Sequence, residues 1–398
     1  MASISALLSA LCEKIRCLAP PGTDMELRRV SMACILIAMH NLRSARRTTK
    51  TRKSMTPISA LQFIDEGCRR SGLRGFVTKV RHRTTGKTFA MKTLYPLPHE
   101  GLNDTAIYNL RVLREACFMA ACHGHPSFVR LYAVCTKHDT DQYRLLMEQA
   151  GPSLYEVTLH RRLHGTPFRE HEVRRMMRQV LSGAKAMHEL GIVHRNIVAE
   201  NVLVGFSSFT VKIGGFGQAT CTSETDVPCN VAVRDEAPEL LLRGRGASES
   251  ELIDSWSIGC LMGKLLTSRT LFEIEANDHE NTARAQLCRI FDVLGVPGKR
   301  AMQEMKPRDF ELAKQVREWR ARRSRVGKAM PQNNNYRLRQ LIPPEVLSDD
   351  GFRVLRGLLM CNPKKRLTAG AALQLPWFAD NDKSPAAGVS QQVSGPVS

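Results

Sequence analysis

The sequence contains no long hydrophobic run and has few aromatic residues. Its apolar stretch from Met32 to Met39 is far shorter than the roughly 20 residues that a membrane-spanning helix needs. No convincing secretory signal is present either. Aromatic residues make up only 6% of the 398 positions, but hydrophobic residues make up 43%, enough for one large or two medium lobes. We therefore predict a globular protein without a membrane segment.

The 12 cysteines form no C-x-x-C pair and show no regular spacing, which argues against a disulfide framework. Cys117, Cys260 and Cys288 lie in apolar helical patterns, where cysteine behaves as a small hydrophobic residue. Cys122-His123-Gly124-His125 lies where a helix is expected to turn into a strand, and it gives little support to zinc. This usage fits a reducing compartment, and we expect a nuclear or cytoplasmic protein.

Acidic residues are scarce: 38 Asp and Glu stand against 58 Lys and Arg, giving a net charge of +20. Such an excess suggests nucleic acid or an anionic membrane as a partner. Because the basic residues are spread along the chain, a generally basic soluble protein is favoured, with neither of those partners. The dense basic stretch from Arg43 to Lys53 fits a nuclear-import patch, a transit segment or a solvated linker, although upstream acidic residues count against transit.

The most informative stretch is 194–204, H-R-N-I-V-A-E-N-V-L-V, which is followed after ten residues by Gly215-Phe216-Gly217. It resembles the protein-kinase catalytic loop H-R-D-x-K-x-x-N and the D-F-G metal loop, with the spacing kept. In that family the loop Asp is the base, the Lys neutralises the transferred phosphate, and the Asn and the D-F-G Asp hold Mg²⁺. The residues that align with these four groups are Asn196, Val198, Asn201 and Gly215.

Only Asn201 keeps the side chain of the family pattern. An Asn amide at position 196 can orient a hydroxyl but is not a base, and Val and Gly carry neither charge nor a metal-ligating oxygen. A general base alone is worth roughly 10²–10⁴ in rate. The resemblance therefore implies a pseudokinase with a scaffold or allosteric role, and Mg²⁺ is not favoured. Two alternatives remain. The chain is a slow or unconventional ATP-dependent Ser/Thr kinase in which a displaced carboxylate, such as that of Asp226, replaces the lost one, or it is a gene product that is no longer under selection.

Motifs of a nucleotide site precede this loop. Residues 72–77, G-L-R-G-F-V, resemble the second half of the G-x-G-x-x-G-x-V loop and contribute Gly72, Gly75 and Val77. Arg70 replaces the first glycine, unless Gly67 serves after an insertion. Residues 89–92, F-A-M-K, match V-A-I-K, and this resemblance implies that Lys92 contacts phosphates and pairs with Glu115 on the next helix.

The stretch from Arg144 to Gly151 resembles the fifth strand and the hinge of a kinase. The resemblance makes Met147 the gatekeeper and places the backbone of Glu148 and Ala150 against adenine. The residues that would sandwich the base are Val77, Ala90 and Leu203. The resemblance thus implies that ATP can bind in the interlobe cleft, although apolar residues at these positions are also expected of core strands.

The structural positions of the large lobe are also retained. An amphipathic helix is expected from Glu172 to Leu190, directly before the catalytic loop. The resemblance implies that His194, Phe216 and Met119 stack in a hydrophobic spine that links the lobes. It also implies that Arg195 pairs with a phosphorylated Thr in active kinases of this group, and the residue at that Thr position here is Val227. The remaining structural residues that it assigns are Glu239 paired with Arg366, and Asp254 on the central helix.

These ordered motifs, from Ile58 to Phe378, resemble the cyclin-dependent-kinase-like group of protein kinases, of a divergent plant type. The resemblance implies an α+β bilobal fold, with a β-rich lobe with one regulatory helix over 58–150 and a mostly helical lobe over 151–378. Residues 1–57 are expected to form an extension with a basic linker, and 379–398 a disordered tail. Protein partners or substrates are expected. Cyclin binding gains no support. The stretch that begins at Asp104 faintly resembles the signature helix of cyclin-dependent kinases, but that signature should end on the conserved glutamate, and Glu115 lies well beyond it.

Overall fold

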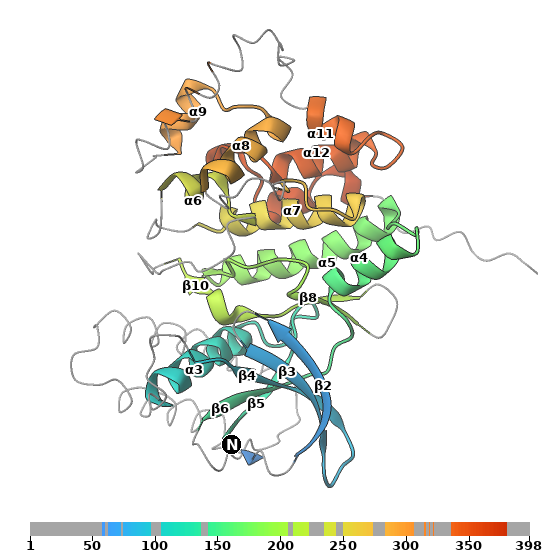
Figure 1. The fold of residues 1–398 in the computed structure, drawn as a ribbon, viewed down its shortest axis with the longest axis vertical. Coiled ribbons are helices and arrows are strands. Elements are labelled where there is room, and N and C mark those ends of the chain that lie inside the picture. Colours follow the sequence, from blue (N-terminus) through green and yellow to red (C-terminus); the bar gives the residue numbers. More distant parts are fainter. Residues whose placement is uncertain are drawn as a thin grey trace, which may run out of the picture.

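The computed structural model describes residues 58–59, 63–72, 75–96, 105–136, 142–205, 210–222, 235–243, 250–273, 283–305 and 336–379, with four single positions between 314 and 321. The described elements form two lobes (Figure 1), a β-sheet lobe with helix α3 and a mostly helical lobe. The predicted α+β bilobal fold is confirmed. All of the predicted extension and all but the first residue of the predicted tail lie outside the described residues, and the domain boundaries stay a prediction.

The small lobe is built on one twisted sheet. Its six described strands have the order β1-β5-β6-β4-β3-β2, with β1 parallel to β5 and the other neighbours antiparallel. One face carries a small core that includes Phe63 and Met91, and the opposite face packs on α3. The bounds are β1 Ile58–Ser59, β2 Phe63–Gly72, β3 Gly75–His82, β4 Thr88–Leu94, α3 Thr105–Ala121, β5 Leu131–Thr136 and β6 Tyr143–Met147.

The first half of the large lobe carries the catalytic-loop motifs. Helix α4 begins with a capping box, in which Ser153 and Glu156 satisfy each other's backbone N–H groups. Helix α5 begins at Glu170, two residues before the position expected from the sequence. The elements are α4 Leu154–Leu163, α5 Glu170–Glu189, β7 Ile192–Val193, β8 Val202–Val204, β9 Val211–Ile213, η2 Phe216–Gln218 and β10 Thr220–Cys221.

The second half of the large lobe surrounds helix α7. Almost every residue of α7 is buried, and Trp256 stacks on Phe272 at a centroid distance of 5.5 Å. Within the described part of the chain, no helix is long and apolar enough to span a bilayer. The elements are α6 Pro238–Arg243, α7 Leu252–Thr267, α8 Ala283–Leu294, α9 Lys299–Glu304, α11 Tyr336–Leu341, α12 Asp349–Leu358, η4 Pro363–Lys365, α13 Ala369–Leu373 and η5 Pro376–Phe378.

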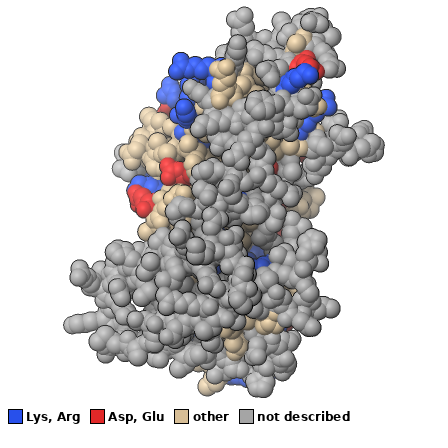
Figure 2. Space-filling model, turned by 90° about the vertical axis from the view of Figure 1, so that its left-hand side faces the viewer, with Lys and Arg blue, Asp and Glu red and all other residues tan. Residues whose placement is uncertain are grey.

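The surface of the large lobe carries mixed charge on the side shown in Figure 2. Blue Lys and Arg side chains gather at the upper end of that view, over the large lobe, and red Asp and Glu side chains lie beside some of them. Both signs of charge are therefore interspersed on the described part of this face.

Asp254, fully buried on α7, holds the backbone of the catalytic loop. Its Oδ2 accepts a hydrogen bond from the backbone N–H of His194 at 2.8 Å, and its Oδ1 accepts one from Arg195 at 2.7 Å. Its Oδ2 also lies 2.9 Å from Nε2 of His188. Burial acts to raise the pKa of this carboxyl, but the hydrogen bonds, led by that of His188, outweigh it and lower the pKa. These bonds hold Arg195 at a φ of 66°, a conformation that non-glycine residues seldom adopt.

Glu239 and Arg366 form a buried bidentate ion pair between α6 and the residue after η4. Arg366 Nη1 and Nη2 donate to the two carboxylate oxygens of Glu239 at 2.7 and 2.8 Å. The side chains are 0% and 6% exposed for Arg366 and Glu239 respectively, so removing one partner would strand the other charge in the interior. Arg366 also donates to the carbonyl of Leu252 at the start of α7.

Substitution of Arg366 by Met should destabilise the protein strongly. The Glu239 carboxylate would lose its compensating charge, which typically costs about 3–5 kcal/mol of unfolding free energy. Arg353→Met is the control, because its ion pair with Asp350 is 66% and 46% exposed and should contribute at most about 1 kcal/mol. Urea unfolding of both variants measures the difference. Similar losses in the two variants would show that burial does not govern this pair.

Substitution of Asp254 by Asn should lower stability at neutral pH and reduce its acid sensitivity. The amide cannot accept all the hydrogen bonds of the carboxylate, and a buried donor left unpaired costs about 1–3 kcal/mol. Because the folded-state pKa of Asp254 is depressed, its stabilisation is complete above the unfolded-state pKa and is lost as the pH falls through the folded-state value. Urea unfolding at neutral and acidic pH should show a smaller acid loss in the variant. Equal losses would contradict this role.

Candidate functional site

The residues that the sequence assigns to nucleotide binding in the small lobe share one face of the sheet. Val77 pairs with Lys92 across β3 and β4, and Ala90 pairs with Met147 across β4 and β6. Directly opposed residues of neighbouring strands point to the same face. Met91, the alternate position on β4, lies in the small core of the opposite face. Val77, Ala90, Lys92 and Met147 therefore lie on the face directed at α3 and the large lobe.

Lys92 and Glu115 form an ion pair between β4 and α3. Lys92 Nζ donates to the two carboxylate oxygens of Glu115 at 2.6 and 2.8 Å. The Glu115 side chain is only 1% exposed and that of Lys92 is 15% exposed. A carboxylate buried this deeply needs a compensating charge, so the pair fixes the Lys92 ammonium beside the strand face described above.

The glycine-containing hairpin joins β2 and β3 above this face. A Cβ on Gly75 would lie 2.2 Å from the carbonyl oxygen of Thr93, so only glycine fits where β3 begins against β4. Gly67, with a φ of +73°, lies in an irregular part of β2, between the paired residues Asp65 and Arg69. It lies well before the hairpin closed by Gly72 and Gly75, so Arg70 holds the position of the first loop glycine.

The hinge is attached to both lobes. The backbone N–H of Glu148 donates to the carbonyl of Arg130 at 2.9 Å, and its carboxylate pairs with Lys212 of β9 at 2.7 Å. Ala150 follows in the same connection between β6 and α4. Leu203, on β8, is partly buried and packs against the same large core as Val77 and Ala90. The three apolar side chains assigned to the base thus come from both lobes and border one core.

The catalytic-loop positions are held together by hydrogen bonds of their own. Asn201 Nδ2 donates to the carbonyl of Asn196 at 2.9 Å, and the backbone N–H of Asn201 donates to the carbonyl of Val198. Gly215 has a φ of +78°, and a Cβ there would lie 2.6 Å from Asn201 Oδ1. The Asn201 amide therefore occupies space that any side chain at position 215 would need.

The donor set at this place does not fit a kinase-type Mg²⁺ site. Of the two positions assigned to the metal, Asn201 supplies one neutral amide oxygen and Gly215 supplies no side chain. Mg²⁺ in such sites is held by carboxylate and phosphate oxygens. Within the described ranges, no group of three or more His, Cys, Asp or Glu residues is arranged to hold a metal ion.

His194 and Phe216 pack together at the junction of the lobes. Their ring centroids lie 4.7 Å apart in an edge-to-face arrangement, and Phe216 lies 5.7 Å from Phe128. Met119 of α3 lies in the same core. Burial lowers the pKa of His194, and its Nε2 lies 3.1 Å from the carbonyl oxygen of Gly214. A neutral, fully enclosed imidazole in this setting is a packing residue rather than a proton shuttle.

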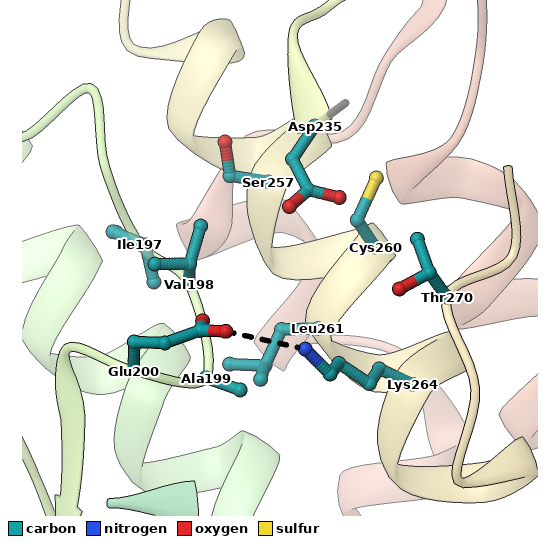
Figure 3. Close-up of a pocket in the computed structure, with 10 residues that line it drawn as sticks. All are labelled: Ile197, Val198, Ala199, Glu200, Asp235, Ser257, Cys260, Leu261, Lys264 and Thr270. Atoms are coloured by element: carbon teal, nitrogen blue, oxygen red, sulfur yellow. Dashed lines mark hydrogen bonds and ion pairs between the residues drawn. The ribbon is translucent and has the colours of Figure 1, made fainter. Parts of the chain in front are cut away.

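Beside the catalytic loop lies a pocket that sequence reasoning missed (Figure 3). It is a small, open depression, and Val198 forms part of its wall. Glu200 and Lys264 approach each other across it at 3.5 Å, and Lys264 also lies 4.8 Å from the ring of Tyr155. The sequence showed Glu200 as a charged residue in the catalytic loop. Its partner Lys264, on α7, could not be identified from the spacing of the sequence.

Arg195 is 3% exposed and lies directly after the first residue of the catalytic loop. The segment assigned to its phosphorylated partner, including Val227 and Asp226, lies outside the described residues. Its predicted role in recognising that segment therefore stays a prediction.

Comparison with known proteins places these features in a family. The protein kinase domain family matches residues 71–378. The putative cyclin-dependent kinase F-2 of Oryza sativa subsp. japonica is 37% identical over 325 residues, covering 79% of this chain and 89% of the relative. Cyclin-dependent kinase G1 of Arabidopsis thaliana is 30% identical over 338 residues, covering 82% of this chain and 49% of the relative, so the chain spans about half of that protein.

A further relative, cyclin-dependent kinase 4 of Xenopus laevis, is 29% identical over 319 residues, covering 79% of this chain and 89% of that protein. The matched region contains the small lobe from the end of β2 onward, the Lys92–Glu115 ion pair, the catalytic loop and the large lobe. The chain therefore belongs to the protein kinase domain family and resembles cyclin-dependent Ser/Thr kinases.

Proposed function

We propose that this chain is a nucleotide-binding pseudokinase that acts through protein partners. The observation that carries the proposal is a contrast between two parts of one site. The Lys92–Glu115 ion pair is formed at 2.6 Å, whereas Asn196, Val198 and Gly215 offer no base, no cation and no metal-ligating carboxylate. The groups that would bind a nucleotide are retained, and the groups that would transfer its phosphate are replaced.

The retained residues fit a purine nucleotide. Val77 and Ala90 from the sheet and Leu203 from β8 provide apolar surfaces for a base, and the hinge at Glu148 and Ala150 provides backbone polar groups beside them. Lys92, fixed by Glu115, supplies a cation for phosphate oxygens. The triphosphate of bound ATP would contact Lys92, and its base would contact the apolar side chains of both lobes. One ligand would therefore contact both lobes and stabilise their closed arrangement.

The replaced residues account for the loss of phosphoryl transfer. An amide at position 196 cannot accept the proton of a substrate hydroxyl, and removing a general base alone costs roughly 10²–10⁴ in rate. Stabilisation of transition-state charge is usually the larger contribution, and both Val198 and Gly215 are neutral. Because such groups act together, the losses need not multiply, but each one reduces the rate severely.

The protein partners are proposed to recognise the kinase fold itself. The three relatives described above are named cyclin-dependent kinases, but the helix signature expected for cyclin binding is out of register in this sequence, so we do not assign a cyclin. A scaffold or allosteric activator needs an ordered fold and not a working catalytic loop. The nucleus, the cytoplasm or both remain the proposed location.

ATP should raise the unfolding temperature without a requirement for Mg²⁺. A ligand present at 100 times its Kd stabilises the folded state by about 2.7 kcal/mol. Lys92→Met should abolish most of the shift, whereas Lys87→Met, in the exposed turn between β3 and β4, should leave it unchanged. Thermal shift with ATP alone and with ATP plus Mg²⁺ measures both effects. A shift that requires Mg²⁺, accompanied by phosphotransfer to a protein substrate, would instead support the slow kinase.

Gly215→Asp should make nucleotide binding respond to Mg²⁺. The new carboxylate would supply the metal ligand that position 215 lacks, once the Asn201 amide rotates away from the space that its Cβ needs. Gly215→Asn is the matched control, because it has the same size and no charge. Titration calorimetry with ATP, in the presence and absence of Mg²⁺, should show tighter binding with the metal only for the Asp variant. An identical response of the two variants would exclude this explanation.

A further inference from the structure

Arg70 brings a positive charge from the small lobe into contact with the large lobe. It lies on β2 and pairs with Val77, one of the residues proposed to cover the base. Its Nη2 lies 2.9 Å from Glu156 Oε2 and donates to the carbonyl of Gly151 at 3.3 Å. The side chain that stands in place of a loop glycine therefore reaches across to the other lobe beside the hinge.

Both partners of Arg70 belong to well-fixed parts of the large lobe. Gly151 donates its backbone N–H to the carbonyl of Val204 at 2.9 Å. Glu156 lies in the first turn of α4, and its Oε2 accepts hydrogen bonds from the N–H and the hydroxyl of Ser153, each at 2.7 Å. Burial acts to raise the pKa of Glu156, but the hydrogen bonds of Ser153 and the charge of Arg70 outweigh it and lower the pKa. Glu156 is thus a fixed carboxylate at neutral pH.

We propose that the Arg70–Glu156 ion pair is an interlobe latch that restrains opening of the lobes beside the hinge and that an incoming nucleotide must displace. In Figure 1, β2 and α4 lie on the same side of the molecule, and α3 lies on the opposite side of the small lobe. On the α3 side, Arg114 donates to the carbonyl of Ala219 at 3.0 Å. The Arg70–Glu156 pair therefore joins the lobes at the edge opposite to the Arg114 contact. Only the displacement by nucleotide rests on the proposed function.

The strength of the pair suits a restraint that can be released. The side chains of Arg70 and Glu156 are 39% and 48% exposed, so solvent and salt screen their attraction. Exposed pairs of this kind change an equilibrium by about two- to fivefold, far less than a buried pair. In addition, the buried Nε of Arg70 has no hydrogen-bond partner among the described residues. The guanidinium is therefore only partly satisfied in its contact with the large lobe.

The test uses three variants of the full chain and one control. Arg70→Met keeps the length of the side chain and removes its charge. Glu156→Gln also removes the charge, yet Gln at this position still supports the capping box of α4. The double variant tests whether the two residues act as one unit. Arg81→Met is the control, because its 2.8 Å ion pair with Glu66 lies within the small lobe.

The first measurement is hydrogen–deuterium exchange of the nucleotide-free proteins. Each single variant should raise backbone exchange over 70–77 and 151–156 by about two- to fivefold, as expected for an exposed pair. The double variant should exceed neither single variant, and Arg81→Met should match the wild type. If Arg70→Met exchanges like Arg81→Met, the pair is an ordinary surface contact and the latch is refuted.

The second measurement is the affinity for a fluorescent ATP analogue. Release of the latch should tighten binding by about two- to fivefold in Arg70→Met and in the double variant. Weaker binding in Arg70→Met would mean that Arg70 holds the nucleotide, and unchanged binding would mean that the pair does not restrict it; either result overturns displacement by nucleotide. Raised exchange with no binding in any protein, the wild type included, would support the restraint and refute the proposed nucleotide binding instead.

Discussion

The arrangement of the site depends on the buried carboxylate of Asp254. It accepts hydrogen bonds from two successive backbone N–H groups of the catalytic loop, at His194 and Arg195. Those bonds hold Arg195 in a left-handed conformation, so the chain turns there and the following residues return toward β8. A backbone fixed in this way does not depend on which side chains the loop carries afterwards. The geometry can therefore persist when the base and the lysine of a kinase are replaced.

Four buried charged residues of the family motifs have compensating partners. Asp254, Glu239, Arg366 and Glu115 are buried, charged and paired, and loss of one partner would leave an uncompensated charge in the interior. The replacements at Val198 and Gly215 remove charge and leave no such orphan. Neutral residues at these places are therefore compatible with a stable fold.

The interface between the lobes combines contacts of different strength. The packing of Phe216 against Phe128 is buried and apolar, whereas the Arg70–Glu156 pair is partly exposed and electrostatic. Salt screens the exposed ion pair but has little effect on the buried apolar contact.

The sequence by itself determined the bilobal fold and the replacement of three catalytic groups, because motif order and spacing carry that information locally. It also pointed to the Lys92–Glu115 pair, since both residues lie in family motifs. Only the tertiary structure placed the Asn201 amide against Gly215 and brought Glu200 to Lys264 or Arg70 to Gly151. The last two contacts join residues 64 and 81 positions apart, on elements whose approach depends on how the lobes and helices pack. No local pattern encodes that approach, because the same side chains would be solvated surface charges in any other packing.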